Sequence, residues 1–417
     1  MRAAPFFPPH PPYAVSGSGA WISDADGYRI FDCANNFFSL IHGHSFEPVV
    51  AALQGVLQHG TAYGLPTPAE NDLAEEIRTR SPELEQIRFT GSGTEAVMFA
   101  VKAARAITGR PAIAKFEGAY HGAYDYVEVS LDPPPGQIPD APPVSHIYAR
   151  WTPQTVADQV VVLPYDDADM CRAIITENRE RLAAVLLDPL SSRIAMVPVA
   201  PAVRTALQEC CHRYGILLVL DEVVSYRLDV GGAYRLYGLK PDLVALAKII
   251  GGGLPVGAVA GPAGHMSVFD HTSGKPPVSH GGTFSANPLS MTAGLACLKA
   301  YDGPAVARLN DLGALLRGLL GEAIGRAGIH AQVTGDGSFF RLHLKKGRLS
   351  DYRTAYPTPA QKTALREIHL SVLKRGVLLT PNCSGALSTP MSQSNVRDLA
   401  STVAEALSEV VQQQKWD

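Results

Sequence analysis

The most informative part of the chain reads GILLVLDEVV at residues 215–224 and, after a break, LVALAKIIGGGLPVGAVAG at residues 243–261. Neither run alternates polar with apolar residues, and this pattern is typical of strands buried on both faces of a sheet. The first apolar run ends at Asp221, and the next ends at Lys248, shortly before three glycines. We therefore predict two strands that carry a carboxylate and an amine at the edge where open α/β sheets bind ligands.

Similar short apolar runs alternate with helix-like segments through the middle of the chain, at residues 87–90, 113–116, 184–188 and 256–260. This alternation predicts an α/β body with a largely parallel sheet. Beyond residue 301 the pattern changes to that of an α+β unit. We predict three parts: an N-terminal arm with a small antiparallel segment at 1–50, a large domain at 51–300, and a small C-terminal domain at 301–417.

Proline marks two stretches as irregular, because it fixes φ and supplies no amide donor. Residues 1–15 are predicted to be an arm or a disordered tail. Residues 121–160 form a long connection without helical periodicity, and loops of such length are commonly functional lids or disordered. Between these stretches, Asp26-Gly27 indicates a tight hairpin turn within residues 20–32.

Composition excludes several classes of protein. The 417 residues carry 36 Lys and Arg against 39 Asp and Glu, a net charge of -3, so we expect no nucleic-acid partner. No apolar leader and no run of eighteen apolar residues is present, so we expect a cytoplasmic protein without a membrane partner. The six cysteines show no C-x-x-C spacing and have no histidines at zinc-ligand offsets, so we expect no metal site.

A turn rich in small residues, TGSGTEA at residues 90–96, joins a predicted strand to a predicted helix. Backbone amides converge at such a turn, and the helix dipole favours an anion there. The same residues also fit an ordinary Ser/Thr helix cap, so both interpretations stay open. The turn lacks the Gly-Lys-Ser/Thr of a P-loop and the spacing of dinucleotide binders, which favours a smaller phosphate.

Side chains alternate along a strand, so Asp221 and Val223 are predicted to face the same side while Glu222 faces away. One flat ligand could then touch both a carboxylate and an apolar side chain. A buried aspartate needs a donor partner, and a protonated heteroaromatic nitrogen would serve. The alternatives for Asp221 are a helix cap or half of a structural ion pair.

Lys248 follows a nearly continuous apolar run, and burial there would lower the pKa of its amine and make it a nucleophile that forms Schiff bases. A lysine that extends its amine to solvent is the alternative. The glycines at 251–253 indicate that the backbone must let something approach closely. A phosphate site, a partner for a pyridinium nitrogen and an amine together predict pyridoxal phosphate as the cofactor.

Five segments carry a recognisable pattern: FTGSGTEAVMFAVKAARAITGR at 89–110, KFEGAYHG at 115–122, LLVLDEVVSYR at 217–227, PDLVALAKIIGGGLPVGAVAG at 241–261 and HGGTFSANPLSMTAG at 280–294. They resemble the class III aminotransferases of fold type I, within them the glutamate-1-semialdehyde 2,1-aminomutase branch and the β-amino-acid transaminases. The resemblance extends from about residue 16 to the C-terminus. It implies a large domain with a mainly parallel, seven-stranded sheet and a smaller α+β domain.

The resemblance also implies a role for each matching residue. Lys248 would carry the internal aldimine and move the substrate proton, and Asp221 would keep the pyridine nitrogen protonated. The remaining cofactor contacts would be Val223 and Tyr120 on the two ring faces, Ser92, Gly93 and Thr94 at the phosphate, and Thr283 from a neighbouring subunit. A homodimer is therefore expected.

The sequence departs from these relatives where they recognise their substrates. Gly385 stands where the mutase has a glutamate, and Asn382 stands where the β-phenylalanine type has an arginine. Arg193 replaces an asparagine of the mutase, and we predict that it contacts the ring oxygen or a substrate carboxylate; a surface ion pair is the alternative. Arg2 matches, by counting, an arginine that both relatives use for the substrate carboxylate.

These observations predict an aminotransferase that moves an amino group between an amino acid, with β-amino acids among the candidates, and an oxo acid or aldehyde. The alternative is a mutase that transfers nitrogen within one substrate. A nucleotide-binding protein without this chemistry is a third class, and the combination of Lys248 and Asp221 argues against it. An absorbing band that borohydride abolishes would separate the third class from the other two.

Overall fold

The computed structural model describes residues 7, 8, 10–134, 141–272 and 274–413. Its centre is a seven-stranded sheet in the order β4-β10-β9-β8-β7-β5-β6. Strand β10 runs antiparallel to both of its neighbours, and the other pairs are parallel. The strands are β4 (Gln86–Thr90), β5 (Ala112–Phe116), β6 (Val160–Leu163), β7 (Leu182–Leu187), β8 (Leu217–Asp221), β9 (Leu243–Ala247) and β10 (Gly257–Gly261). The predicted sheet is confirmed.

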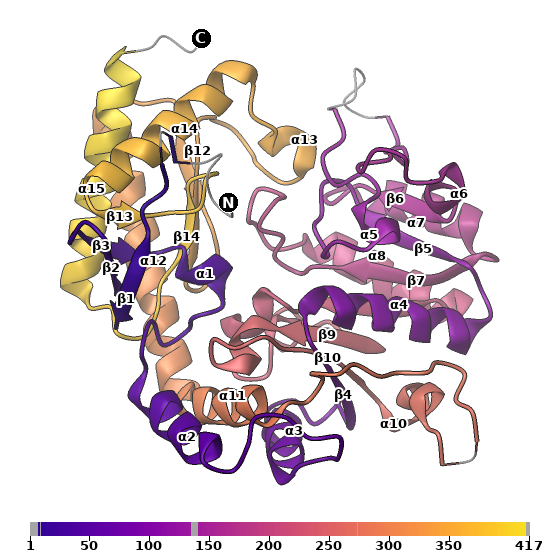
Figure 1. Cartoon of the computed structure of the whole chain (residues 1–417). Helices are drawn as coiled ribbons and strands as arrows, with labels where there is room; N and C mark the ends of the chain where they lie inside the picture. The colour runs from indigo at the N-terminus through magenta and orange to yellow at the C-terminus, as the bar shows by residue number, and fades with distance from the viewer. Residues whose placement is uncertain (1–6, 9, 135–140, 273, 414–417) are drawn as a thin grey trace.

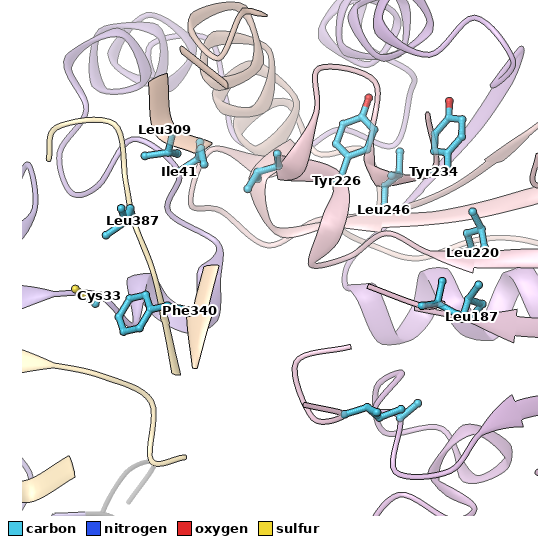
Figure 2. Close-up of a cluster of buried hydrophobic side chains, with 14 of the residues drawn as sticks. Cys33, Ile41, Leu187, Leu220, Tyr226, Tyr234, Leu246, Leu309, Phe340 and Leu387 are labelled. Atoms are coloured by element: carbon cyan, nitrogen blue, oxygen red, sulfur yellow. The ribbon is translucent and has the colours of Figure 1, made fainter. Parts of the chain in front are cut away.

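Helices cover the sheet, and α4 crosses it beside β9 and β10 (Figure 1). Strands β5 to β10 are buried along their whole length, which explains why their sequences are apolar except at Lys115 in β5 and Asp221 at the end of β8. Leu187, Leu220 and Leu246 come from three adjacent strands of one continuous core (Figure 2). The helices of this part are α2 (Glu47–Leu57), α3 (Pro68–Arg80), α4 (Gly93–Thr108), α7 (Ala168–Asn178), α8 (Pro201–Tyr214) and α11 (Pro288–Ala300).

The C-terminal part is built on a three-stranded antiparallel sheet with the order β11-β12-β14. The long helix α12 packs against α15, and α14 packs against α15 in turn. In Figure 1 this part lies beside the seven-stranded sheet. Its elements are α12 (Gly303–Ala327), β11 (Gln332–Thr334), β12 (Phe339–His343), α13 (Tyr352–Ala355), α14 (Pro359–Lys374), β13 (Val377–Leu378), β14 (Ser384–Ala386) and α15 (Gln393–Gln413).

The predicted hairpin at Asp26-Gly27 joins β2 (Trp21–Asp24) to β3 (Arg29–Asp32), and β1 (Ala14–Ser18) pairs with β2. Strand β3 also pairs in parallel with β13, so the N-terminal and C-terminal parts share one four-stranded sheet. The division at residues 50 and 300 stays a prediction.

Strand β6 was not predicted, because it follows directly on the proline-rich connection, where the described residues form only two brief helices. None of the described helices is long and apolar enough to cross a membrane.

Short helical turns complete the fold. They are α1 (Asn35–Phe38), α5 (Asp125–Glu128), α6 (Gln154–Ala157), η2 (Ser225–Leu228), α9 (Ala233–Leu236), η3 (Lys248–Gly251), α10 (Ala263–Met266) and η4 (Ser267–Phe269).

Candidate active site

A cavity of about 410 Å³ opens at the carboxyl ends of β8 and β9. Six elements or loops contribute to its wall: α1, the β4–α4 turn, the loop after β5, and the segments that follow β7, β8 and β9. The predicted residues that line it are Ser92, Gly93, Thr94, Tyr120, Asp221, Val223 and Lys248. Residues far apart in sequence therefore meet in one hollow.

Asp221 ends β8 and is buried. Its Oδ1 accepts a hydrogen bond from the Val223 amide at 3.1 Å, and its Oδ2 lies 2.8 Å from His121 Nδ1. Burial lowers the pKa of His121, so the imidazole is neutral near pH 7 and donates from Nδ1 to Asp221. A helix cap is not found among the described contacts of Asp221, and the partner that its ion-pair alternative requires is His121, whose lowered pKa makes the contact a hydrogen bond from a neutral imidazole.

The predicted alternation around Asp221 is present in the structure. Val223 lines the cavity, whereas Glu222 points into the protein. The Glu222 carboxylate accepts hydrogen bonds from the Ser225 hydroxyl and from the amides of Ala233 and Tyr234. Burial raises its pKa to about 7. Glu222 therefore supports the turn behind Asp221 and takes no part in the cavity.

Lys248 follows β9 with φ of 52°, a left-handed conformation that is strained for a residue with a Cβ. Burial lowers the pKa of its amine, while the carboxylates of Asp221 and Asp188 oppose that shift. The amine therefore loses its proton more readily than that of an exposed lysine. The alternative of a lysine extended into solvent does not agree with this placement.

The glycines after Lys248 serve the fold more than the ligand. A Cβ on Gly252 would lie 2.3 Å from the Ala293 carbonyl oxygen, so this glycine lets α11 approach the chain. Only Gly253 of the three lines the cavity. The close approach expected at these glycines is therefore present at Gly252, where the backbone of α11 makes it.

The β4–α4 turn forms the predicted helix cap, and its geometry is compatible with the predicted phosphate site. Ser92 is the N-cap of α4, since its Oγ accepts from the Glu95 amide at 3.2 Å and its carbonyl oxygen accepts from the Ala96 amide. The first amides of a helix have no partner within the helix. Those of Gly93 and Thr94 therefore remain at a cavity wall that both residues line. A Cβ on Gly93 would come within 3.1 Å of Val223, so a larger residue would fill the space a ligand needs.

Tyr120 is half exposed and lines the same cavity as Val223. Burial of the rest of the ring raises the pKa of its hydroxyl, so the phenol is neutral. Gly122 comes two residues after Tyr120 and has φ of 94°. A Cβ on Gly122 would lie 2.5 Å from Thr94 Oγ1, so this glycine packs directly against Thr94. The aromatic ring and the phosphate-binding turn are in this way held next to each other.

Sequence reasoning missed several residues of the site. Asp188 follows β7, the neighbour of β8, and lies buried in the cavity wall. Burial and the nearby Asp221 raise its pKa well above the ordinary value. The rule that identified Asp221, a carboxylate at the end of an apolar strand, also applies to Asp188. Ser192 lines the wall as well, and no sequence signal marked it.

The remaining predicted residues lie outside this cavity. Thr283 borders a second hollow with Tyr63 and Arg88. Arg193 is 41% exposed and lies 3.7 Å from Asp132, as its surface ion-pair alternative requires. Asn382 Oδ1 accepts hydrogen bonds from the hydroxyls of two neighbours in its own turn, Thr380 and Ser384. Arg2 lies outside the described residues.

The described residues fit pyridoxal phosphate. A phosphate can bind at the start of α4, a ring can lie between Tyr120 and Val223, its nitrogen can face Asp221, and Lys248 supplies the amine. The fold and this cavity define a transferase of fold type I that depends on pyridoxal phosphate. The chain belongs to the class-III aminotransferase family, whose model matches residues 9–391. It is therefore an enzyme of that family.

Known proteins agree with this membership. A glutamate-1-semialdehyde 2,1-aminomutase from Thermomicrobium roseum is 37% identical over 89% of this chain and 84% of its own length. The crystal structure of an omega-transaminase from Sphaerobacter thermophilus has 45% identity and a TM-score of 0.95, covering 98% of this chain and 94% of the other. A beta-phenylalanine aminotransferase from Variovorax paradoxus has 30% identity and a TM-score of 0.84, covering 99% and 90%.

Proposed function

We propose that the chain transfers an amino group between two molecules, from an amino acid to an oxo acid or aldehyde, and that β-amino acids are among its donors. Proteins named as transaminases of both the omega and the beta-phenylalanine type are similar to it over nearly its full length. The observation that carries the choice of an intermolecular reaction lies at Gly385.

Gly385 occupies the position of the mutase glutamate, and it has no room for a side chain. A Cβ there would lie 2.4 Å from the Phe340 ring and 3.2 Å from Cys33 Cβ. Figure 2 shows Phe340 and Cys33 side by side in the apolar cluster of this region. The acid that distinguishes the mutase is thus replaced by packed apolar side chains. This arrangement supports a transaminase over a mutase.

The roles of the residues follow from their chemistry. When bound, pyridoxal phosphate supplies an aldehyde that carries the amino group and a ring that accepts electrons. Lys248 Nζ, with its lowered pKa, takes the proton from the substrate carbon and returns it at the end of the transfer. Asp221, oriented by His121, would face the ring nitrogen and stabilise its proton. Tyr120 and Val223 would hold the two faces of the ring, and the first turn of α4 would bind the phosphate.

The mutase remains a second candidate, because a mutase is 37% identical to the chain. Purified holoenzyme should be incubated with a panel of amino donors, with and without an added oxo acid. Turnover that depends on the oxo acid, with pyridoxamine phosphate accumulating in its absence, is the expected result. Sustained isomerisation of glutamate-1-semialdehyde without any acceptor would contradict the proposal.

We further propose that the chain works as a homodimer in which Thr283 completes the phosphate site of the neighbouring subunit. Thr283 is exposed, and three large exposed apolar side chains lie in or beside the hollow that it borders: Leu65 (77% exposed), Phe284 (66%) and Tyr63 (49%). A contiguous apolar surface of this kind marks a protein interface. Sedimentation of wild type and Phe284→Asp tests it, since the variant should become monomeric and lose cofactor affinity together.

A further inference from the structure

Arg341, on β12, is a buried arginine whose guanidinium forms hydrogen bonds on one side only. It is 7% exposed, and its Nη1 donates to the carbonyl oxygens of Ser192 at 3.1 Å and Arg193 at 3.3 Å. Nε is buried and has no partner, and Nη2 donates to no described residue. Within the described chain Arg341 forms no ion pair. The edge of a guanidinium that matches a carboxylate is therefore free.

A second guanidinium lies close to the first. Burial and the positive charge of Arg193 lower the pKa of Arg341 to about 10. The one carboxylate that pairs with Arg193 among the described residues is Asp132, at 3.7 Å, which is beyond hydrogen-bond distance. Buried charge without a counter-ion is costly. An anion that arrives with a ligand would remove this cost.

Each arginine lies next to a residue that lines the cavity, although neither lines it. Ser192, whose carbonyl oxygen Arg341 contacts, lines the cavity, and the charge of Arg193 acts on the pKa of Tyr120, which lines it too. The face of β12 that carries Arg341 is turned to this loop, since His343, two residues further along, lies 3.1 Å from the Ala195 carbonyl oxygen through Nε2. An anion between the two arginines would thus lie beside Ser192.

We propose that Arg341 and Arg193 bind the carboxylate of the substrate between them, with Arg341 using its Nε–Nη2 edge. A guanidinium fork suits a carboxylate because it offers two parallel donors. The inference rests on the proposed amino transfer and names its substrate class, which is donors and acceptors that carry a carboxylate. Arg341 is then a residue that determines specificity, and amines without a carboxylate bind without its help.

The experiment uses the holoenzyme and propanoate, an acid without an amino group, titrated by calorimetry. Arg341→Gln removes the charge, Arg341→Lys keeps the charge without the fork, and Arg193→Gln tests the second arginine. Arg317→Gln is the matched control, because Arg317 Nη1 also donates to two carbonyl oxygens, those of Gly337 and Phe339. Amino transfer from a β-amino acid and from the amine that lacks its carboxylate is measured in parallel.

Arg341→Gln is expected to weaken propanoate binding at least about tenfold and to raise KM for the β-amino acid, with KM for the amine within about twofold of wild type. Arg341→Lys should fold and weaken propanoate binding several-fold, and it decides the matter if the Gln variant does not fold. Unchanged propanoate affinity, an equal loss of amine and acid, or the same loss in Arg317→Gln overturns the proposal. Arg341-dependent binding in a protein that exchanges no amino group supports the acid site and refutes the proposed function.

Discussion

Two buried carboxylates end neighbouring strands within the same cavity, and their surroundings differ. Asp221 accepts a hydrogen bond from His121 and one from the Val223 amide. Asp188 accepts one from the Leu190 amide, and burial beside Asp221 raises its pKa well above the ordinary value. Two like charges in one buried site do not both ionise. We therefore expect Asp188 to be the one that takes up a proton more readily.

This assignment predicts opposite outcomes for two equivalent substitutions. Asp221→Asn removes the anion that faces the ring nitrogen, so kcat should fall by about 10²-fold or more. Asp188→Asn replaces a carboxyl with a raised pKa by a neutral group of the same shape and keeps the acceptor for Leu190, so kcat should stay within about threefold. Steady-state kinetics with saturated cofactor provides the measurement. Equal losses of kcat in the two variants would contradict the different roles given to the two residues.

Lys248 provides a second prediction at the residue scale. Lys248→Ala should lower the rate of amino transfer by at least about 10²–10⁴-fold, because the variant has lost its proton-transfer group. The cofactor of the variant should no longer become fixed to the protein by borohydride. Lys240→Ala, at an exposed lysine, is the control and should match wild type in both measurements. Full turnover by Lys248→Ala would remove this lysine from the reaction.

At the scale of single elements, glycines in one helix have opposite surroundings. Gly313 and Gly321 both lie within α12. A Cβ on Gly313 would lie 2.0 Å from the Gly337 carbonyl oxygen, whereas one on Gly321 would meet nothing within 4 Å. Gly313 therefore lets α12 pack closely against the chain that precedes β12. Gly321 makes no such contact and only lowers the stability of the helix.

Gly321→Ala should accordingly raise the free energy of unfolding by about 0.5–1 kcal/mol, since alanine has the higher helix propensity. Gly313→Ala should lower it by about 1–3 kcal/mol, because the helix must move away from residue 337. Urea denaturation of the two variants beside wild type checks both signs. A stabilised Gly313→Ala would mean that this helix contact is looser than described.

Some of the elements could be predicted from the sequence and others could not. Apolar runs and turn residues predicted the central strands and the hairpin, because each is a local pattern. Strand β6 was missed, as its four residues carry no turn signal that separates them from the prolines before them. The hydrogen bond between His121 and Asp221 could not be predicted, because the two residues lie a hundred positions apart in the sequence. Arg341 carried no signal at all, since its free edge exists only where two parts of the chain meet.

At the scale of the whole molecule, buried histidines lower the free energy of unfolding as the pH falls. Burial lowers the pKa of His343 to about 3 and that of His369 to about 4. Both take up a proton near pH 6.5 once the chain unfolds. The contribution of each histidine to the free energy of unfolding is therefore fully present above about pH 6.5. It is lost as the pH falls toward the pKa of the folded state, by about 2 kcal/mol per histidine at pH 5.

His369 allows this to be tested, because neither ring nitrogen has a partner among the described residues. His369→Phe should flatten the decline of the unfolding free energy between pH 7 and 5 by about 2 kcal/mol. His330→Phe, at an exposed histidine, should leave the slope unchanged. Urea titrations at several pH values measure it. An unaltered slope in His369→Phe would place the acid sensitivity elsewhere.

The parallel pairing of β3 with β13 has a consequence for how the protein is made. Phe31 and Val377 are register partners, so during synthesis the hairpin of β2 and β3 must wait for more than three hundred further residues before its edge is covered. Pairings between such distant segments form slowly, and an open strand edge invites association with other chains. During synthesis this hairpin is therefore a part of the nascent chain that a chaperone would protect. The four-stranded sheet closes only after β13 has been made.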